Sequence, residues 1–318
     1  MNFTTFAKER MFDRSALASL QQLFLFVGLA ILVLLIWWMW PHSPVVAVAM
    51  VIASVTAHAW VLAVEFLLIP VLRASDATPR ASSAELIRSW MVEVVQAWRV
   101  FAWRQPFHWR SIPDVLHGPR VKHRTGVVFI HGIICNRGFW TPWLERLNTD
   151  GRAFVAVNLE PVFTDIDDYV NLLEQAVIKV ERSTGRPPLL VCHSMGGLVA
   201  RAWLRRTEVA RIERVVTIGS PHSGTWYARF SLVPNGREMD PNSPWMAQLN
   251  GAWTPQQAAL FTCWYSNCDN IVQPPAAATL PGADNRLVRG AAHIELAFRP
   301  EVMRGTLAML RDDVSADS

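Results

Sequence analysis

Residues 189–201 read LLVCHSMGGLVAR, and this stretch decides which class of fold the chain adopts. An apolar run, a turn with paired glycines and a helix-favouring segment to residue 206 follow one another. This order predicts that Ser194 lies on a sharp turn between a strand and a helix, where a nucleophilic serine can be exposed. The pattern G-x-S-x-G is met at Ser194 and Gly196, but Cys192 takes its first position. The motif is therefore incomplete, and other residues must decide the chemistry.

Small residues around Ser194 fit such a turn. Gly196 and Gly197 let a strand and a helix approach closely, and Cys192 is small enough to be tolerated. Cys192 is disfavoured as a nucleophile because it precedes the turn that exposes Ser194. We expect it to be a buried structural thiol.

The chain from about Arg124 predicts an α/β fold with a mostly parallel, doubly wound sheet. Short apolar runs alternate there with amphipathic segments, and the runs are continuously apolar, as buried parallel strands are. The expected strands are 126–131, 153–158, 189–193, 214–219 and 260–266. The expected helices are 141–148, 167–182, 196–206 and 300–311.

The N-terminal part predicts a membrane hairpin. Residues 20–40 carry no charge and are long enough to cross ~30 Å of hydrocarbon, and residues 45–72 form a second apolar run. A signal peptide is disfavoured because the first run exceeds the ~7–15 residues of its apolar core and no A-x-A-like site ends it. We expect Glu65 near the membrane interface, with pairing to His58 or a functional role as alternatives.

Basic residues predict that both ends of the hairpin face the cytoplasm, because the connecting PHSP contains none. They are Lys8, Arg10 and Arg14 before the hairpin and Arg73, Arg80 and Arg88 after it. We therefore expect the protein in a membrane, such as a bacterial inner membrane, with the catalytic domain in the cytoplasm.

Composition narrows the partners further. The net charge of +4 is too small and scattered to indicate nucleic acid, although it is compatible with an anionic membrane surface. We expect no metal and no cofactor, since no residues show metal-ligand spacing. Four cysteines are expected to be reduced thiols, and a disulfide between the last two would argue against the cytoplasmic topology. They are Cys135, Cys192, Cys263 and Cys268.

Residues after the hairpin predict an amphipathic helix that ends before Pro106. Ser82 and Glu85 are spaced as a capping box. One interpretation is an interfacial helix that places three tryptophans at the lipid headgroups; the other is a helix packed on the catalytic domain. The tryptophans are Trp90, Trp98 and Trp103.

Three blocks carry a family resemblance: VVFIHGIICNRGFW, VCHSMGGLVAR and IGSPHSGT. Together they resemble the lipase branch of the α/β-hydrolase superfamily, with bacterial triacylglycerol lipases and GPI-inositol deacylase-like proteins as the nearest groups. The resemblance covers about residues 124–311, implies an α/β-hydrolase fold for them and leaves out the two transmembrane helices that the apolar runs predict before them. The expected divisions are a cytoplasmic N-terminus at 1–19, a transmembrane hairpin at 20–72, a linker with the amphipathic helix at 73–123 and the catalytic domain at 124–312.

A catalytic serine needs a histidine to take its proton and a carboxylate to orient that histidine. In this fold the chain order is serine, acid, histidine. Only His222 and His293 follow Ser194, and His222 precedes the most plausible acids, so His293 is the expected base.

Asp269 is the favoured acid because it follows the strand 260–266 and so lies at the carboxyl end of the sheet. Asp240 and Asp284 also satisfy the order. They occur in proline-rich and turn-like sequence, where a solvated or turn-stabilising aspartate is usual.

Two backbone N–H groups should stabilise the oxyanion that forms at the attacked carbonyl. Met195 follows the nucleophile and is the first expected donor. His131 and Gly132 resemble the oxyanion motif of lipases, which makes Ile133 the second.

Residues 224–257 are rich in proline, asparagine and aromatic side chains. The resemblance implies a cap or lid over the acyl pocket at this position, with an ordinary connection as the alternative. The side chains expected to line the pocket are Trp226, Phe230, Trp245 and Met246.

These observations predict a membrane-anchored serine hydrolase that cleaves carboxylic esters, with a lipid or other acyl ester as substrate. A thioesterase or an amidase with the same triad, and a catalytically silent membrane binding module, are the alternatives. Transport through the hairpin is ranked last, because two helices make a poor pathway. The oligomeric state is not predicted.

Overall fold

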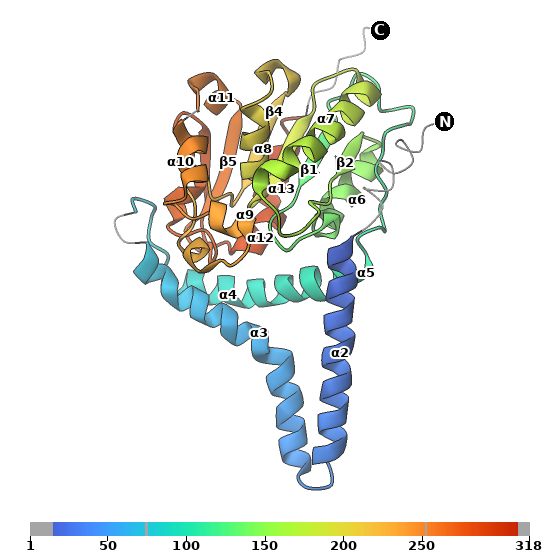
Figure 1. Cartoon of the computed structure of the whole chain (residues 1–318), viewed down its shortest axis with the longest axis vertical. Coiled ribbons are helices and arrows are strands. Elements are labelled where there is room, and N and C mark those ends of the chain that lie inside the picture. Colours follow the sequence, from blue (N-terminus) through green and yellow to red (C-terminus); the bar gives the residue numbers. More distant parts are fainter. Residues whose placement is uncertain (1–14, 74–75, 252, 311–318) are drawn as a thin grey trace.

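The chain forms a six-stranded parallel sheet carried on a long helical hairpin (Figure 1). This computed structural model describes residues 15–73, 76–251 and 253–310. The strand order is β2-β1-β3-β4-β5-β6, and every neighbouring pair is parallel. The strands are β1 Val127–Ile130, β2 Phe154–Ala156, β3 Leu189–His193, β4 Arg214–Ile218, β5 Phe261–Ser266 and β6 Asp284–Val288.

Helices cover both faces of the sheet. Side chains of β1 alternate between two cores, with Val128 on one side and Phe129 on the other. The Val128 core contains residues of α7 (Val170–Thr184) and α8 (Gly196–Leu204). The opposite core contains residues of three helices, which are α6 Thr141–Asp150, α12 His293–Phe298 and α13 Pro300–Leu307. The expected doubly wound α/β fold is therefore confirmed.

One strand was not expected. β6 lies at the edge of the sheet and has the sequence DNRLV. Its first two residues are exposed, so the segment lacks the apolar run of a buried strand. Asp284 consequently begins a strand instead of lying in a turn, and its carboxylate pairs with Arg286 at 2.7 Å.

Two long apolar helices project from the catalytic domain, α2 (Ala16–Met39) and α3 (Pro44–Leu72) (Figure 1). Both are long and apolar enough to cross a membrane. Of the most apolar 18-residue stretch in each helix, 0% is buried in α2 and 6% in α3. They are therefore not core helices of a globular domain. Their joined ends lie far from the sheet, and the free ends adjoin it. The basic residues Lys8, Arg10 and Arg14 lie outside the described residues.

Polar contacts hold the start of α2 against the catalytic domain. Ser15 caps the helix, and its hydroxyl accepts a hydrogen bond of 3.3 Å from the amide of Asn136, in the loop that follows β1. Gln22 donates to the carbonyl of Pro106 at 2.6 Å. The hairpin is thus fastened close to the carboxyl edge of the sheet.

The segment after the hairpin is helical as predicted, but it continues past Pro106. Helix α4 (Ser83–Ala97) has the expected capping box of Ser82 and Glu85. A π-helical stretch, η1 (Trp98–Arg104), and the short α5 (Gln105–Phe107) extend it. Pro106 is accommodated because it lies in the first turn of α5, where its missing N–H is not needed.

Helix α4 buries its polar side. Glu85 pairs with Arg289 at 3.0 Å, and the carboxylate of Glu93 accepts the N–H groups of Ile294 and Glu295 at 2.8 and 3.0 Å. Trp90 packs on α3, and its indole N–H donates to the carbonyl of Ala59 at 2.9 Å, so it joins α4 to the hairpin. A stripe of apolar side chains is left between 42% and 57% exposed on α4 and the first turn of η1. It consists of Ile87, Met91, Val95 and Trp98.

Glu93 is fully buried, and burial raises its pKa from an ordinary 4.5 to about 8, although the two amide hydrogen bonds partly oppose this. The folded chain therefore retains a proton on Glu93 that an unfolded chain releases near pH 4.5. Protonated Glu93 stabilises the fold fully below pH 4.5, and this contribution is lost as the pH rises through about 8.

Replacing Glu93 with glutamine should flatten the dependence of stability on pH. As the pH rises from 4.5 to 8, the free energy of unfolding of the wild type should fall by on the order of a few kcal/mol relative to that of Glu93→Gln, because the amide does not titrate. The difference in Tm between the two proteins, measured across this range, tests it. Glu208→Gln, at an exposed position, should follow the wild type. Parallel curves for wild type and Glu93→Gln would contradict the prediction.

Candidate active site

The turn between β3 and α8 holds Ser194 in a left-handed conformation, with φ of 54°. Only close packing keeps a non-glycine residue there, and the N–H of Ser194 donates to the carbonyl of Ile218 at 3.0 Å. Gly196 is required beside it, since a Cβ would overlap the backbone carbonyls of Ile130 and His131. The local geometry is that of the expected strand-to-helix elbow.

Cys192 faces the core beneath the elbow. It is fully buried, and burial raises the pKa of its thiol well above the usual range, so it stays protonated. All four cysteines are free and buried, as expected for reduced thiols.

Asp269 and His293 lie together at the carboxyl edge of the sheet. The Nδ1–H of His293 donates to the carboxylate of Asp269, with distances of 2.9 Å to Oδ2 and 3.1 Å to Oδ1. The carboxylate also accepts the N–H groups of Ile271 and Val272, at 2.9 and 2.8 Å. Both side chains are buried, so the acid is fixed and directed at the imidazole.

The environment of His293 favours its protonated form. Burial by itself lowers the pKa of the imidazole, but the charge of Asp269 and its hydrogen bond outweigh burial and raise the pKa above 6.5. Glu93 and Glu65 contribute in the same direction. An imidazolium formed during a reaction would therefore be stabilised at this position.

His193 was not anticipated from the sequence and holds His293 from behind. Its Nε2 lies 3.2 Å from the carbonyl of His293, an acceptor, so Nε2 carries the proton. Its ring stacks on Phe139 with centroids 4.4 Å apart. Burial lowers the pKa of His193 well below its usual range and keeps it neutral. The only signal in the sequence was its place next to Ser194.

The loop after β1 approaches Ser194 closely. A Cβ at Gly132 would lie 2.7 Å from the Cβ of Ser194, so only glycine fits. His131 fixes this loop, because its Nδ1–H donates to the carbonyl of Gly132 at 2.9 Å and its Nε2 accepts the N–H of Leu159 at 3.0 Å. Burial lowers the pKa of His131 to about 4, consistent with a neutral ring.

The two expected oxyanion donors flank the serine. Ile133 lines the same cavity as Ser194, and the side chain of Met195 is buried in the core, which leaves its backbone at the elbow. In the described part of the chain, neither N–H donates to a backbone carbonyl in a turn or loop.

The alternative candidates for the acid and the base make other contacts. His222 is buried beside Thr217, with 3.0 Å between its Nε2 and the threonine hydroxyl. Asp240 accepts the N–H of Asn242 in a local turn, at 2.9 Å. His222, Asp240 and the edge-strand Asp284 do not line the cavity that contains Ser194; Asp269 does not line it either, but its carboxylate binds Nδ1 of His293, which does.

That cavity has a volume of about 400 Å³, and the hairpin and α4 form part of its wall. Ser194 and His293 line it together with Leu62 of α3 and Phe101 of η1. The expectation that residues 224–257 line the pocket is wrong for the four side chains proposed, which are Trp226, Phe230, Trp245 and Met246. Met246 is buried in the sheet core instead.

Glu65 reaches the site from α3 and does not pair with His58. Its carboxylate accepts a hydrogen bond of 2.7 Å from the amide of Asn270, whose Oδ1 in turn accepts the N–H of His293 at 3.1 Å. His58 contacts the carbonyl of Val94 at 3.2 Å. The hairpin is therefore connected to His293 through a single side chain.

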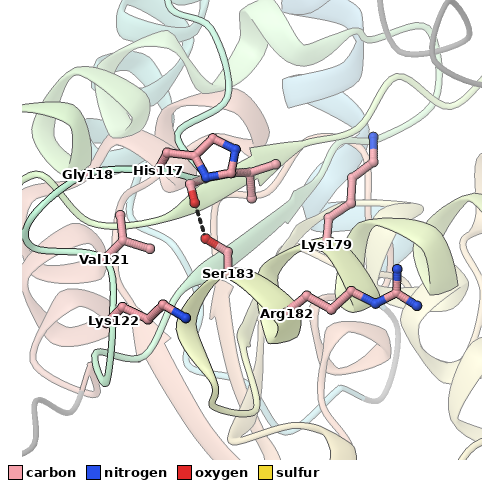
Figure 2. Close-up of a pocket in the computed structure, with 8 residues that line it drawn as sticks. His117, Gly118, Val121, Lys122, Lys179, Arg182 and Ser183 are labelled. Atoms are coloured by element: carbon pink, nitrogen blue, oxygen red, sulfur yellow. Dashed lines mark hydrogen bonds between the residues drawn. The ribbon is translucent and has the colours of Figure 1, made fainter.

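A second hollow, of about 450 Å³, lies between residues 116–122 and the end of α7 (Figure 2). Its basic side chains include Lys122 and Arg182, and the hydroxyl of Ser183 donates to the carbonyl of Leu116. These segments precede β1 and β3, so the hollow lies at the amino edge of the sheet, opposite Ser194. Within the described ranges, no cluster of histidine, cysteine and acidic side chains could hold a metal ion.

A comparison with solved structures finds similar chains. The mature form of the Bacillus licheniformis lipase BlEst2 matches with a TM-score of 0.51 and 19% identity, over 61% of this chain and 94% of that chain. Aspergillus fumigatus lipase B matches with a TM-score of 0.48 and 18% identity, over 57% and 51%. A comparison with curated protein sequences finds no match.

The expected kinship to bacterial triacylglycerol lipases and GPI-inositol deacylase-like proteins remains a prediction. A family model described as the alpha/beta hydrolase family matches residues 127–313, which is more than half of the chain. The matched region begins at β1, includes the elbow, Asp269 and His293, and leaves out the hairpin and α4. This chain belongs to the alpha/beta hydrolase family.

Proposed function

We propose that the chain is a membrane-anchored serine hydrolase that cleaves carboxylic esters with a lipid-like acyl group. The observation that carries the proposal is the buried hydrogen bond between Asp269 and His293, together with a cavity that His293 shares with Ser194, a serine on a strained elbow. Acyl transfer by a serine requires these three groups at one place.

The chemistry follows from the arrangement. Ser194 Oγ attacks the ester carbonyl while Nε2 of His293 takes its proton, and Asp269 holds Nδ1–H and stabilises the imidazolium. The N–H groups of Ile133 and Met195 stabilise the oxyanion. His293 then protonates the departing alcohol, and water hydrolyses the acyl-enzyme by the same steps in reverse order.

The cavity supports an apolar acyl group as substrate. Leu62, Ile133 and Phe101 are among its lining side chains, and the two acidic residues on its wall, Glu65 and Glu93, are hydrogen-bonded to Asn270 and to backbone amides. An apolar chain can therefore enter without stripping water from an unpaired charge.

The exposed apolar surface of the hairpin supports our proposal that the protein is located at a membrane. Helices α2 and α3 are almost wholly unburied, and helix α4, which carries the exposed apolar stripe, lies on the same side of the domain as the hairpin. Large apolar surfaces of this kind are not stable in water. We place the hairpin in the bilayer, α4 at its interface and the catalytic domain on the cytoplasmic side, as the basic residues flanking the hairpin suggest.

Hydrolysis of para-nitrophenyl esters of graded chain length tests the function. The wild type should turn over these esters with rates that rise toward long chains, and Ser194→Ala should lower kcat by about 10³-fold or more, because the nucleophile is lost. Activity confined to short chains would indicate a general esterase. Ester turnover that persists in Ser194→Ala would contradict the assigned nucleophile, and its absence in the wild type would point to a thioester, an amide or a silent module.

Substitution of Gly132 tests the oxyanion loop. In Gly132→Ala the new methyl group meets the Cβ of Ser194 and displaces the loop that carries the N–H of Ile133. We expect kcat to fall about 10²- to 10³-fold, the usual effect of losing one oxyanion donor. Gly251→Ala is the matched control, because a Cβ there meets nothing within 4 Å. Equal kcat values for the two variants would exclude the loop from catalysis.

A further inference from the structure

A separate hollow of about 350 Å³ lies between the two hairpin helices and η1. Leu25 of α2, Ala57 of α3 and Ala102 of η1 are among its lining residues. All of them precede β1, so this hollow lies outside the region matched by the family model. Its existence depends on the hairpin.

The hollow adjoins the catalytic cavity. Ala97 and Phe101 line both spaces, so these two side chains form the boundary between them. They are one helical turn apart and lie where α4 passes into the π-helical η1. Short π-helical stretches inside helices often occur at functional sites.

One face of α3 lines both the outer hollow and the catalytic cavity. Ser54 and His58 line the outer hollow, and Leu62 and Glu65 line the catalytic cavity. Their spacing of four, four and three residues places them on one side of the helix, over about 16 Å of its length. The same face thus leads from the exposed part of the hairpin to the neighbourhood of Ser194.

The lining of the outer hollow suits a hydrocarbon chain. Its side chains are mostly small or apolar, and the polar atom Nε2 of His58 is engaged with the carbonyl of Val94 at 3.2 Å. This part of α3 belongs to the segment that is long and apolar enough to cross a membrane, and Ala57 is exposed there. The surroundings proposed for the hairpin supply such chains.

We propose that the outer hollow binds the acyl chain of a bilayer lipid whose ester carbonyl lies at Ser194, and that the lipid enters sideways between α3 and η1. The inference rests on the function proposed above. Phe101, at the boundary of the two spaces, then determines how long an acyl chain can pass. The acyl site of this hydrolase is accordingly built from its membrane anchor.

Narrowing the hollow tests this proposal. Ala57→Phe fills it without touching the catalytic cavity, and Ala53→Phe places the same side chain at an exposed position of α3 that lines neither space. Each full-length protein is incorporated in phosphatidylcholine vesicles. We compare kcat/KM for para-nitrophenyl palmitate with that for para-nitrophenyl butyrate.

The ratio of palmitate to butyrate hydrolysis should fall about tenfold or more in Ala57→Phe and stay within about twofold of wild type in Ala53→Phe, since loss of a few methylene contacts has effects of this size. An unchanged ratio in Ala57→Phe, or the same fall in both variants, would overturn the proposal. If the wild type hydrolyses neither ester, the proposed function itself fails, and the two failures are therefore distinguishable.

Discussion

The arrangement of this site depends on how His293 is held. Asp269 binds its Nδ1–H, Asn270 accepts its N–H and His193 donates to its carbonyl. Glu93 accepts the next two amides of the same helix. His293 is thus held at its ring, at its backbone and through its helix. This restricts its rotation, which is the preorganisation that its proposed role as a catalytic base requires.

One of these supports comes from outside the hydrolase domain, and a second is itself held from outside it. Glu93 belongs to α4, and Asn270 is itself bound by Glu65 of the hairpin. The hairpin and α4 also supply part of the wall of the catalytic cavity. The hairpin therefore contributes to the cavity that contains Ser194, and the carboxyl edge of the sheet faces it; if the hairpin spans a membrane as proposed, an ester in that membrane would lie close to the serine.

Local pattern and chain order were sufficient to predict the strand, the turn at Ser194 and the contact between Asp269 and His293, while the catalytic roles of these residues remain predictions. Strand β3, the elbow and the choice of Asp269 and His293 needed only periodicity and the order of the three groups. The sequence could not predict β6, whose partly exposed edge position removes the apolar run. Nor could it predict Glu93 as a buried group, because an amphipathic pattern does not say which face meets protein and which meets lipid. The four side chains expected to line the pocket were predicted wrongly because α3 and α4, which are distant in the sequence, supply part of the pocket wall instead.

The most direct test of this account is to react the protein with an active-site-directed fluorophosphonate and locate the adduct by mass spectrometry of its peptides. The account predicts one adduct, on Ser194, which is absent in Ser194→Ala. It also predicts that the adduct forms at least about 10²-fold more slowly in His293→Ala, because the serine loses its base. An adduct on another residue, or a rate unaffected by removal of His293, would contradict it.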